Sequence, residues 1–225
     1  MADTVELETG PEPRGSIIWL HGLGADGHDF EPVVPELRLP ASLPLRFVFP
    51  HAPVRPVTVN GGMAMRAWYD IVSLDADGRA DEAGIRDSSA ILDALVAREV
   101  ERGLSRADVV LAGFSQGGAV ALFNALTTPH RYAGVMALST YLPLPSVVAE
   151  EAQGDASVPV FMAHGTMDPM VPLAGGRHAR QVLEAHGYDV EWHEYPMMHA
   201  VCPREIADIR GWLLRTYGVD DVTRN

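Results

Sequence analysis

The chain has 225 residues, of which 47% are hydrophobic and 21% are charged, and its formal net charge is −13. This length and composition suit one compact α/β domain spanning 1–225, with loosely ordered ends at about 1–14 and 218–225. The single cysteine, Cys202, excludes an internal disulfide and a cysteine-rich zinc site.

The acidic balance argues against nucleic-acid binding through a basic face and gives no support for a polybasic membrane contact. The N-terminus shows no positive segment followed by an apolar run. No apolar stretch approaches the ~20 residues that span a bilayer. We therefore expect a cytoplasmic protein with no stable membrane insertion.

Apolar runs typical of β-strands recur along the chain. Most are continuously apolar rather than alternating, which suits strands covered on both faces of a sheet. The expected strands are 16–20, 45–49, 108–114, 132–138, 158–164 and 189–195.

Segments with helical spacing lie between these runs. Apolar periodicity predicts helices over about 85–100 and 174–186, and the stretch 119–126 is apolar nearly all round, which predicts a buried helix. An amphipathic last helix is expected to begin near Pro203. This alternation of strand and helix predicts a mostly parallel sheet with helices on both faces, and such sheets place their chemistry at the carboxyl ends of the strands.

The stretch VVLAGFSQGGAVALF places a polar serine, Ser115, where a buried strand is expected to turn into a buried helix. Residues 113–117, GFSQG, match the G-x-S-x-G pattern of a nucleophile elbow, in which a strained tight turn exposes the serine Oγ. The same turn directs the next backbone N–H, that of Gln116, toward a developing oxyanion. The pattern alone is weak, because a chance match is expected in roughly one such chain in ten. The strand before it and the helix after it are the context that the motif requires.

A nucleophilic serine needs a base, and the order Ser, acid, His is the one that α/β hydrolases use. The expected acid is Asp168, which follows the strand ending near 164, whereas Asp155 and Asp189 lie at the opposite ends of strands. The expected base is His199, on the loop between the last strand and the last helix. In these roles His199 deprotonates Ser115, and Asp168 fixes the imidazole tautomer. The histidines that fall inside elements, and are expected to be packing or surface residues, are His164, His178, His186 and His193.

A second oxyanion donor is expected from the loop after an early strand, where WLHGLGADGHDF offers the N–H of Leu23. Gly22, Gly24 and Gly27 also fit the G-x-G-x-x-G spacing of a dinucleotide-binding loop. That alternative is disfavoured because no acidic residue ends a clear second strand about 20 residues further on.

Taken together, the motifs resemble the acyl-protein thioesterase and type II carboxylesterase family, also called the phospholipase/carboxylesterase family. The resemblance spans roughly 15–217 and is carried by LHGLGADGHDF, FPHAPVRPVTVNGGMAMRAWYDI, GFSQGGAVAL, ALSTYLPL, HGTMDPMVPL and EYPMMHAVCPREI, in family order. It implies an α/β-hydrolase fold without a large cap domain. It implies a serine hydrolase that cleaves carboxylic esters of small or acylated substrates. Some members of the family cleave thioesters such as palmitoyl-cysteine in lipidated proteins, and others act on lysolipids. It also implies that no cofactor or metal is needed, and some family members are homodimers.

By this resemblance Ser115, Asp168 and His199 carry over as the catalytic triad. The backbone N–H groups of Leu23 and Gln116 carry over as the oxyanion donors.

Two positions depart from the family pattern. Arg66 stands where a proline is common, next to Trp68 of the presumed active-site loop, and Thr166 stands where an acidic or amide residue is frequent. Neither belongs to the triad, and Arg66 is the change that bears on the shape of that loop and on the acyl-chain preference.

An apolar groove for an acyl chain is expected near the segment AWYDIVSL, with ordinary packing as an equal alternative for each residue. Cys202 is expected to be a packed small hydrophobe rather than a second nucleophile. The candidate groove residues are Leu23, Trp68, Ile71, Leu74, Met170 and Val171.

Three other functions are weighed. A lysophospholipase activity uses the same triad on a different ester. A non-catalytic scaffold that only binds an acyl ligand is disfavoured because no triad member is missing. A metallohydrolase that uses several of the nine histidines as ligands is disfavoured because no H-E-x-x-H or comparable ligand spacing is present.

Overall fold

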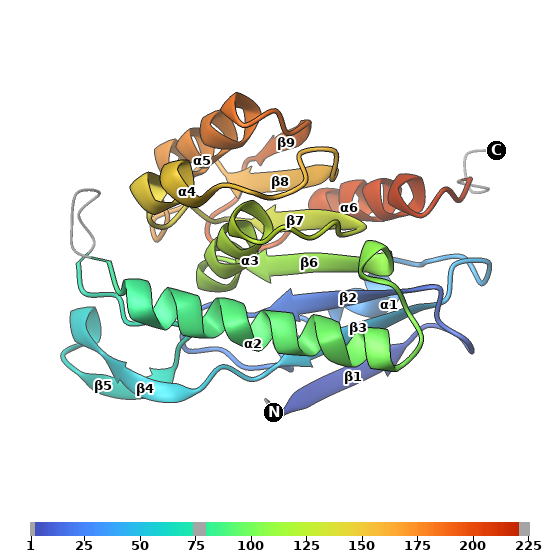
Figure 1. Ribbon diagram of the computed structural model, residues 1–225, viewed down its shortest axis with the longest axis horizontal. Coiled ribbons are helices and arrows are strands. Elements are labelled where there is room, and N and C mark those ends of the chain that lie inside the picture. The colour runs from blue at the N-terminus through green and yellow to red at the C-terminus, as the bar shows by residue number, and fades with distance from the viewer. Residues whose placement is uncertain (1–2, 74–79, 221–225) are drawn as a thin grey trace.

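The computed structural model describes residues 3–73 and 80–220. Its centre is a seven-stranded sheet in the order β1-β3-β2-β6-β7-β8-β9 (Figure 1). Strand β1 pairs antiparallel with β3, and the other neighbours in the sheet pair in parallel. The strands of this sheet are β1 (Thr4–Glu8), β2 (Gly15–Leu20), β3 (Leu45–Pro50), β6 (Val109–Phe114), β7 (Gly134–Leu138), β8 (Val160–Gly165) and β9 (Val190–Tyr195).

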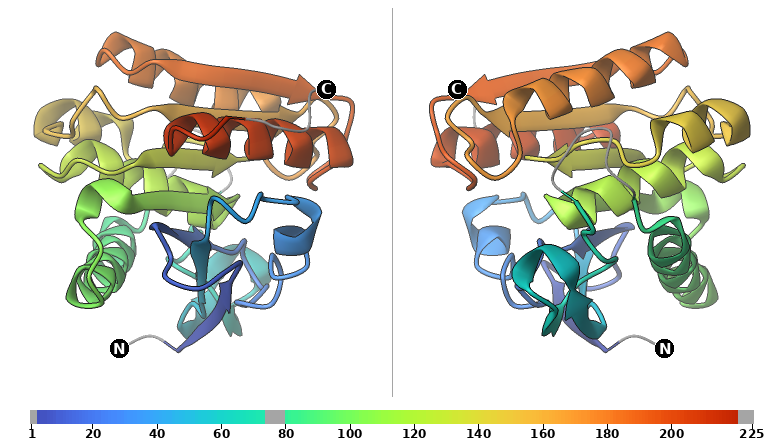
Figure 2. Two further views of the ribbon diagram at one scale, coloured as in Figure 1. Left: turned by 90° about the vertical axis from the view of Figure 1, so that its right-hand side faces the viewer. Right: turned by 90° about the vertical axis from the view of Figure 1, so that its left-hand side faces the viewer.

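Helices cover both faces of the sheet (Figure 2). Residues of α2, α3, α4 and α5 pack into one hydrophobic cluster, and residues of α1 and α6 pack into the other. The helices are α1 (Val33–Glu36), α2 (Glu82–Glu101), α3 (Gln116–Thr127), α4 (Pro145–Glu151), α5 (Leu173–Ala185) and α6 (Pro203–Thr216).

The strand side chains divide between these two cores by simple alternation. On β2, Ile18 and Leu20 belong to the core under α2–α5, whereas Ile17 and Trp19 belong to the core under α1 and α6. Both sets are almost fully buried, which is why the sequence of the strand is apolar at successive positions instead of alternating with polar residues. This confirms the expected mostly parallel sheet with helices on both faces, and the six expected strands appear as β2, β3, β6, β7, β8 and β9.

The expectation that residues 1–14 are loosely ordered is wrong for 4–8, which form strand β1. Val5 and Leu7 pack against the core, while Glu6 forms ion pairs of 2.8 Å with Arg98 and with Arg102. A short edge strand that alternates charged and apolar residues looks like a polar tail in the sequence, because the partners that neutralise its charges lie far along the chain.

The expected loose C-terminus over 218–225 is also wrong at its start. Val219 packs against the core and donates its N–H to Leu214 O at 2.8 Å. Residues 221–225 lie outside the described residues.

A two-stranded hairpin of β4 (Val54–Val57) and β5 (Met63–Arg66) was not expected from apolar runs. A 3₁₀ turn at Thr58–Asn60 and two glycines, Gly61 and Gly62, connect its strands. The hairpin leads directly into the segment from 67 onward. Trp68 of that segment is hydrogen-bonded to His21, after β2, and to Gln116, after β6, which places the segment at the carboxyl edge of the sheet. Within the described residues, no helix has the length and apolar character needed to cross a membrane.

Candidate active site

Ser115 lies at the tip of a sharp turn between β6 and α3. Its backbone torsions are φ 53° and ψ −119°, a region that non-glycine residues seldom adopt. The Ser115 N–H donates to Leu138 O of β7 at 2.9 Å, which holds the strained residue against the neighbouring strand. The expected nucleophile-elbow geometry is therefore present at the end of β6.

Two glycines make this turn possible. A Cβ on Gly113 would lie 2.3 Å from the carbonyl atoms of Gly117, and a Cβ on Gly117 would lie 2.4 Å from Leu20 O. Real Cβ atoms do not approach backbone that closely, so α3 can pack this tightly on β2 and β6 only with glycine at both positions.

The structure brings Asp168 and His199 together. Asp168 follows β8 and His199 follows β9, and His199 Nδ1 lies 2.7 Å from Asp168 Oδ2. The Asp168 side chain is fully buried, and its Oδ1 accepts the N–H groups of Met170 at 2.8 Å and Val171 at 2.9 Å. One carboxylate oxygen is thus fixed by backbone, which leaves the other to orient the imidazole.

His199 also lies beside the nucleophile turn. Its ring packs on the ring of Phe114, the residue before Ser115, with centroids 4.7 Å apart. Among the described residues no hydrogen bond joins Ser115 Oγ to His199. Catalytic hydrogen bonds are often long in the absence of substrate and shorten when it binds.

His164 is a packing residue, as the sequence suggests. It is 1% exposed, and its Nε2 lies 2.9 Å from Val171 O and 3.6 Å from Asp168 Oδ2. It therefore packs beneath the loop that carries Asp168.

The two expected oxyanion donors border Ser115 from different segments. Gln116 opens α3, where the first backbone N–H groups of a helix have no partner within the helix. In the loop after β2, a Cβ added to Gly22 would lie 3.5 Å from the Ser115 Cβ, so this loop runs close beside Ser115. The N–H of the next residue, Leu23, makes no hydrogen bond in the part of the chain that the structure describes.

The expected acyl groove is only partly consistent with the structure. Trp68 does not line an open groove: it is fully buried, and its indole N–H donates to His21 O at 2.9 Å. Val171 is also buried; its N–H donates to Asp168 Oδ1, and its carbonyl oxygen lies 2.9 Å from His164 Nε2. Ile71 is half-buried against the core, and Leu74 lies outside the described residues.

Three exposed methionines are sequence neighbours of the triad candidates. Met167, Met170 and Met198 are 58%, 69% and 59% exposed, and they flank Asp168 and His199 in the sequence. Only Met170 was expected at the site. The motifs MDPM and MMH could have indicated the other two, because each places a methionine directly beside a triad candidate.

The two departures from the family pattern have different surroundings. Arg66 Nη1 donates to Ala52 O at 2.9 Å, and Arg66 O accepts the Gly24 N–H at 2.8 Å, so Arg66 supports the loop after β2. Thr166 is exposed, and its N–H donates to Tyr195 O of β9.

Cys202 is half-buried and packs against the core, in agreement with the expected packing role. It is the N-cap of α6: its side chain accepts the Glu205 N–H, and the Glu205 carboxylate accepts the Cys202 N–H. Glu205 is fully buried, and desolvation raises the pKa of its carboxyl to about 8.

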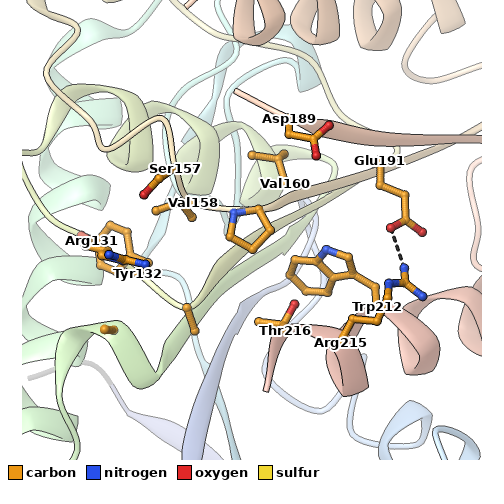
Figure 3. A pocket seen from close by; sticks show the side chains of 13 residues that line it. Arg131, Tyr132, Ser157, Val158, Val160, Asp189, Glu191, Trp212, Arg215 and Thr216 are labelled. Carbon is orange, nitrogen blue, oxygen red and sulfur yellow. Dashed lines mark hydrogen bonds and ion pairs between the residues drawn. The ribbon is translucent and has the colours of Figure 1, made fainter. Parts of the chain in front are cut away.

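A cavity of about 550 Å³ lies at the other end of the sheet, where β7, β8 and β9 begin (Figure 3). Trp212 and the ion pair of Arg215 with Glu191, 2.6 Å long, line it. None of the triad candidates borders this cavity. Within the described residues, no group of three or more His, Cys, Asp or Glu side chains could hold a metal ion.

Known proteins share both the sequence and the fold. The chain is 39% identical to acyl-protein thioesterase 1 of Neurospora crassa over 208 residues, which covers 88% of this chain and 85% of that relative. It is 38% identical to acyl-protein thioesterase 1 of Cryptococcus neoformans over 218 residues, which covers 88% and 91%.

Solved structures agree with the sequence matches. The fold is similar to that of Arabidopsis thaliana SOBER1, with a TM-score of 0.84 and 30% identity, covering 91% of this chain and 99% of that one. It is equally similar to Zea mays acyl-protein thioesterase 2, with a TM-score of 0.84 and 26% identity, covering 96% and 99%.

The family model described as Phospholipase/Carboxylesterase matches residues 4–216. These matches confirm the resemblance read from the motifs, the α/β-hydrolase fold and a hydrolase activity on ester or thioester bonds. The chain therefore belongs to the phospholipase/carboxylesterase family of serine hydrolases.

Proposed function

We propose that this protein hydrolyses acyl esters and thioesters through a covalent acyl-enzyme on Ser115. The observation that carries the proposal is the 2.7 Å hydrogen bond between His199 and the buried Asp168, formed beside the strained turn that presents Ser115. A base oriented by a buried carboxylate next to a serine at a nucleophile elbow is the arrangement that acyl transfer requires.

In the proposed acylation step, His199 Nε2 takes the proton of Ser115 Oγ as the oxygen attacks the acyl carbon. The carbonyl oxygen becomes an oxyanion that accepts the N–H groups of Leu23 and Gln116. When the intermediate collapses, the bond to the leaving oxygen or sulfur breaks and His199 returns the proton to it. A water molecule, deprotonated by His199 in turn, then attacks the acyl-enzyme and releases the carboxylic acid and free Ser115.

We propose acylated molecules as the substrates, with an S-acylated protein as the first choice. The relatives at 38–39% identity are named acyl-protein thioesterases, which supports this choice. The exposed Met167, Met170 and Met198 beside the triad support it too, because flexible thioether side chains suit apolar chains of varied shape. Of the groove residues expected from the sequence, we retain Leu23, Ile71 and Met170 as acyl contacts.

A chain-length series tests the proposal. Acetyl, butyryl, octanoyl and palmitoyl groups are offered both as oxoesters and as thioesters, with Ser115→Ala as the control. We expect kcat/KM to rise toward octanoyl and palmitoyl in both series, by a factor of at most about four per added methylene. A sharp maximum at acetyl or butyryl would instead indicate a small-ester carboxylesterase, and a preference for lysophospholipids over acyl thioesters would indicate a lysophospholipase.

Location and assembly are also proposals. A cytoplasmic location is supported by the single cysteine and the net charge of −13. A homodimer is supported only by the family resemblance, and sedimentation of the purified protein tests it.

A further inference from the structure

We infer that Trp68 is a positioning residue that ties together the two halves of the oxyanion hole. The inference rests on the proposed function, because it concerns the two N–H donors, Leu23 and Gln116, assigned above. These donors come from segments far apart in the chain, the loop after β2 and the start of α3. Trp68 is hydrogen-bonded to both segments.

The first connection runs from Trp68 to Gln116. The Trp68 N–H donates to Gln116 Oε1 at 2.8 Å, and Gln116 Nε2 donates to Tyr69 O at 2.8 Å. One partner is a donor and the other an acceptor, so the two contacts also fix which way the carboxamide points. Gln116 is only 2% exposed. Its two hydrogen bonds hold residues 68–69 against the start of α3, which carries the first oxyanion donor.

The second connection runs from Trp68 to the loop after β2. Its indole Nε1–H donates to His21 O at 2.9 Å, and its ring centroid lies 5.3 Å from that of His21. His21 is itself held, since its Nδ1 lies 2.7 Å from Gly22 O and its Nε2 accepts the Ala52 N–H at 3.1 Å. Only the neutral Nδ1–H tautomer satisfies both contacts, and burial lowers the pKa of His21, which favours that form.

The stretch 66–68 holds the oxyanion loop on both sides of Leu23. On one side the Trp68 indole binds His21 O, and on the other side the carbonyl of Arg66 accepts the Gly24 N–H at 2.8 Å. The loop is rich in glycine, so it gains little rigidity from its own side chains. Apart from the contacts of His21 Nδ1 and the Ala25 N–H with Gly22 O, these external hydrogen bonds hold its shape.

Trp68 is in turn fixed by a third contact. Its carbonyl oxygen accepts the hydroxyl of Ser88 on α2, and the residue is fully buried. All three of its polar groups are thus bonded, each to a different segment. A residue held in this way fixes the position of the oxyanion loop relative to α3. A misplacement of about 1 Å at a catalytic site can reduce the rate about a hundredfold.

The test is the variant Trp68→Phe, which removes the indole N–H and keeps an aromatic ring in the core. The matched control is Trp19→Phe. Trp19 is equally buried and lies on β2, but its indole N–H has no hydrogen-bond partner in the described structure. The two variants lose the same atoms from a buried site, and only the first loses a hydrogen bond to the oxyanion loop.

Three measurements are made on each variant: kcat and KM for p-nitrophenyl butyrate, the melting temperature, and the Ki of a butyryl trifluoromethyl ketone. That inhibitor forms a tetrahedral adduct with a serine and places an oxyanion in the hole. For Trp68→Phe we expect kcat to fall about 10- to 100-fold with KM nearly unchanged, and Ki to rise in parallel with the loss in kcat/KM. Trp19→Phe is expected to keep the wild-type kcat and Ki.

Gln116→Met is the second variant. It removes both carboxamide hydrogen bonds but keeps the backbone N–H that serves as the donor, so it should show the same loss in kcat and the same rise in Ki. The inference is overturned if Trp68→Phe and Gln116→Met lower only the melting temperature, or change only KM. The turnover of the wild-type protein and of Ser115→Ala is measured first. If the wild-type protein shows no turnover that depends on Ser115, the proposed function is wrong. If it does, the Trp68 and Gln116 variants test the positioning role by itself.

Discussion

Asp168 and His199, 31 positions apart in the sequence, are joined by a 2.7 Å hydrogen bond between Oδ2 and Nδ1. The other carboxylate oxygen, Oδ1, accepts two backbone N–H groups, which determines how the side chain is turned. In an Asp168→Asn variant, the amide oxygen should keep those two backbone donors, and the amide NH₂ should face His199. The imidazole would then carry its proton on Nε2 and could not accept one from Ser115.

Asp168→Asn should therefore lower kcat by about 10⁴ while the fold is kept. Steady-state kinetics with p-nitrophenyl butyrate measures this. Asp155→Asn is the control, since Asp155 lies before β8 at the opposite end of the strand and its carboxylate bonds to Ser157. Similar activity in both variants would contradict the role assigned to Asp168.

Ser115→Ala should abolish covalent labelling by a fluorophosphonate and lower kcat/KM by at least about 10⁴, because nucleophile and base act as a unit. Mass spectrometry of the labelled wild-type protein should place the adduct on Ser115. Cys202→Ser should keep both labelling and turnover, because Cys202 packs at the start of α6. Label on another residue, or full activity in Ser115→Ala, would overturn the proposed function.

Gly117→Ala should destabilise the protein by about 2–4 kcal/mol, because the added Cβ would lie 2.4 Å from Leu20 O and α3 would have to move away from β2. The same change at Gly211, inside α6, meets its nearest contact at 3.4 Å, at the end of the flexible Arg215 side chain. Gly211→Ala should stabilise the protein by about 0.5–1 kcal/mol, since alanine favours the helix. Urea unfolding compares the two, and equal effects would refute the steric argument.

Glu205→Gln should make the protein more stable at high pH. Burial raises the pKa of this carboxyl from 4.5 to about 8 in the folded state, so folding favours the protonated form. The folded protein therefore loses stability as pH rises from 4.5 to about 8, and the loss is complete above that value. Glutamine has no such titration and keeps an oxygen that can accept the Cys202 N–H.

The expected gain for Glu205→Gln at pH 9, relative to pH 5, is about 4 kcal/mol, or roughly 8–16 °C in the melting temperature. Differential scanning fluorimetry at the two pH values measures it. Glu150→Gln, at an exposed position on α4, is the control and should show no such difference. A gain that is the same at pH 5 and pH 9 would contradict the raised pKa.

Much of the fold could be predicted because its signals are local. The strands β2, β6, β7 and β8 are continuously apolar, and the breaks between them mark the turns into helices, so the parallel sheet follows from the pattern. The edge strand β1 could not be predicted in this way. Its glutamates are compatible with a strand because arginines of β3 and of the C-terminal end of α2 neutralise them. Those partners lie far away in the sequence, so no local pattern indicates them.

The site divides along the same line. The sequence by itself was enough to predict Ser115, Asp168 and His199 as the site residues, because each follows a strand and the parallel sheet brings strand ends to one edge. Only the tertiary structure decided the position of Trp68, for which the sequence left an acyl contact and ordinary packing as equal alternatives. The fold buries it between Gln116 and His21. The reason is physical: motif spacing depends on a few neighbouring residues, whereas the burial and hydrogen bonds of one side chain depend on segments that meet only when the whole chain has folded.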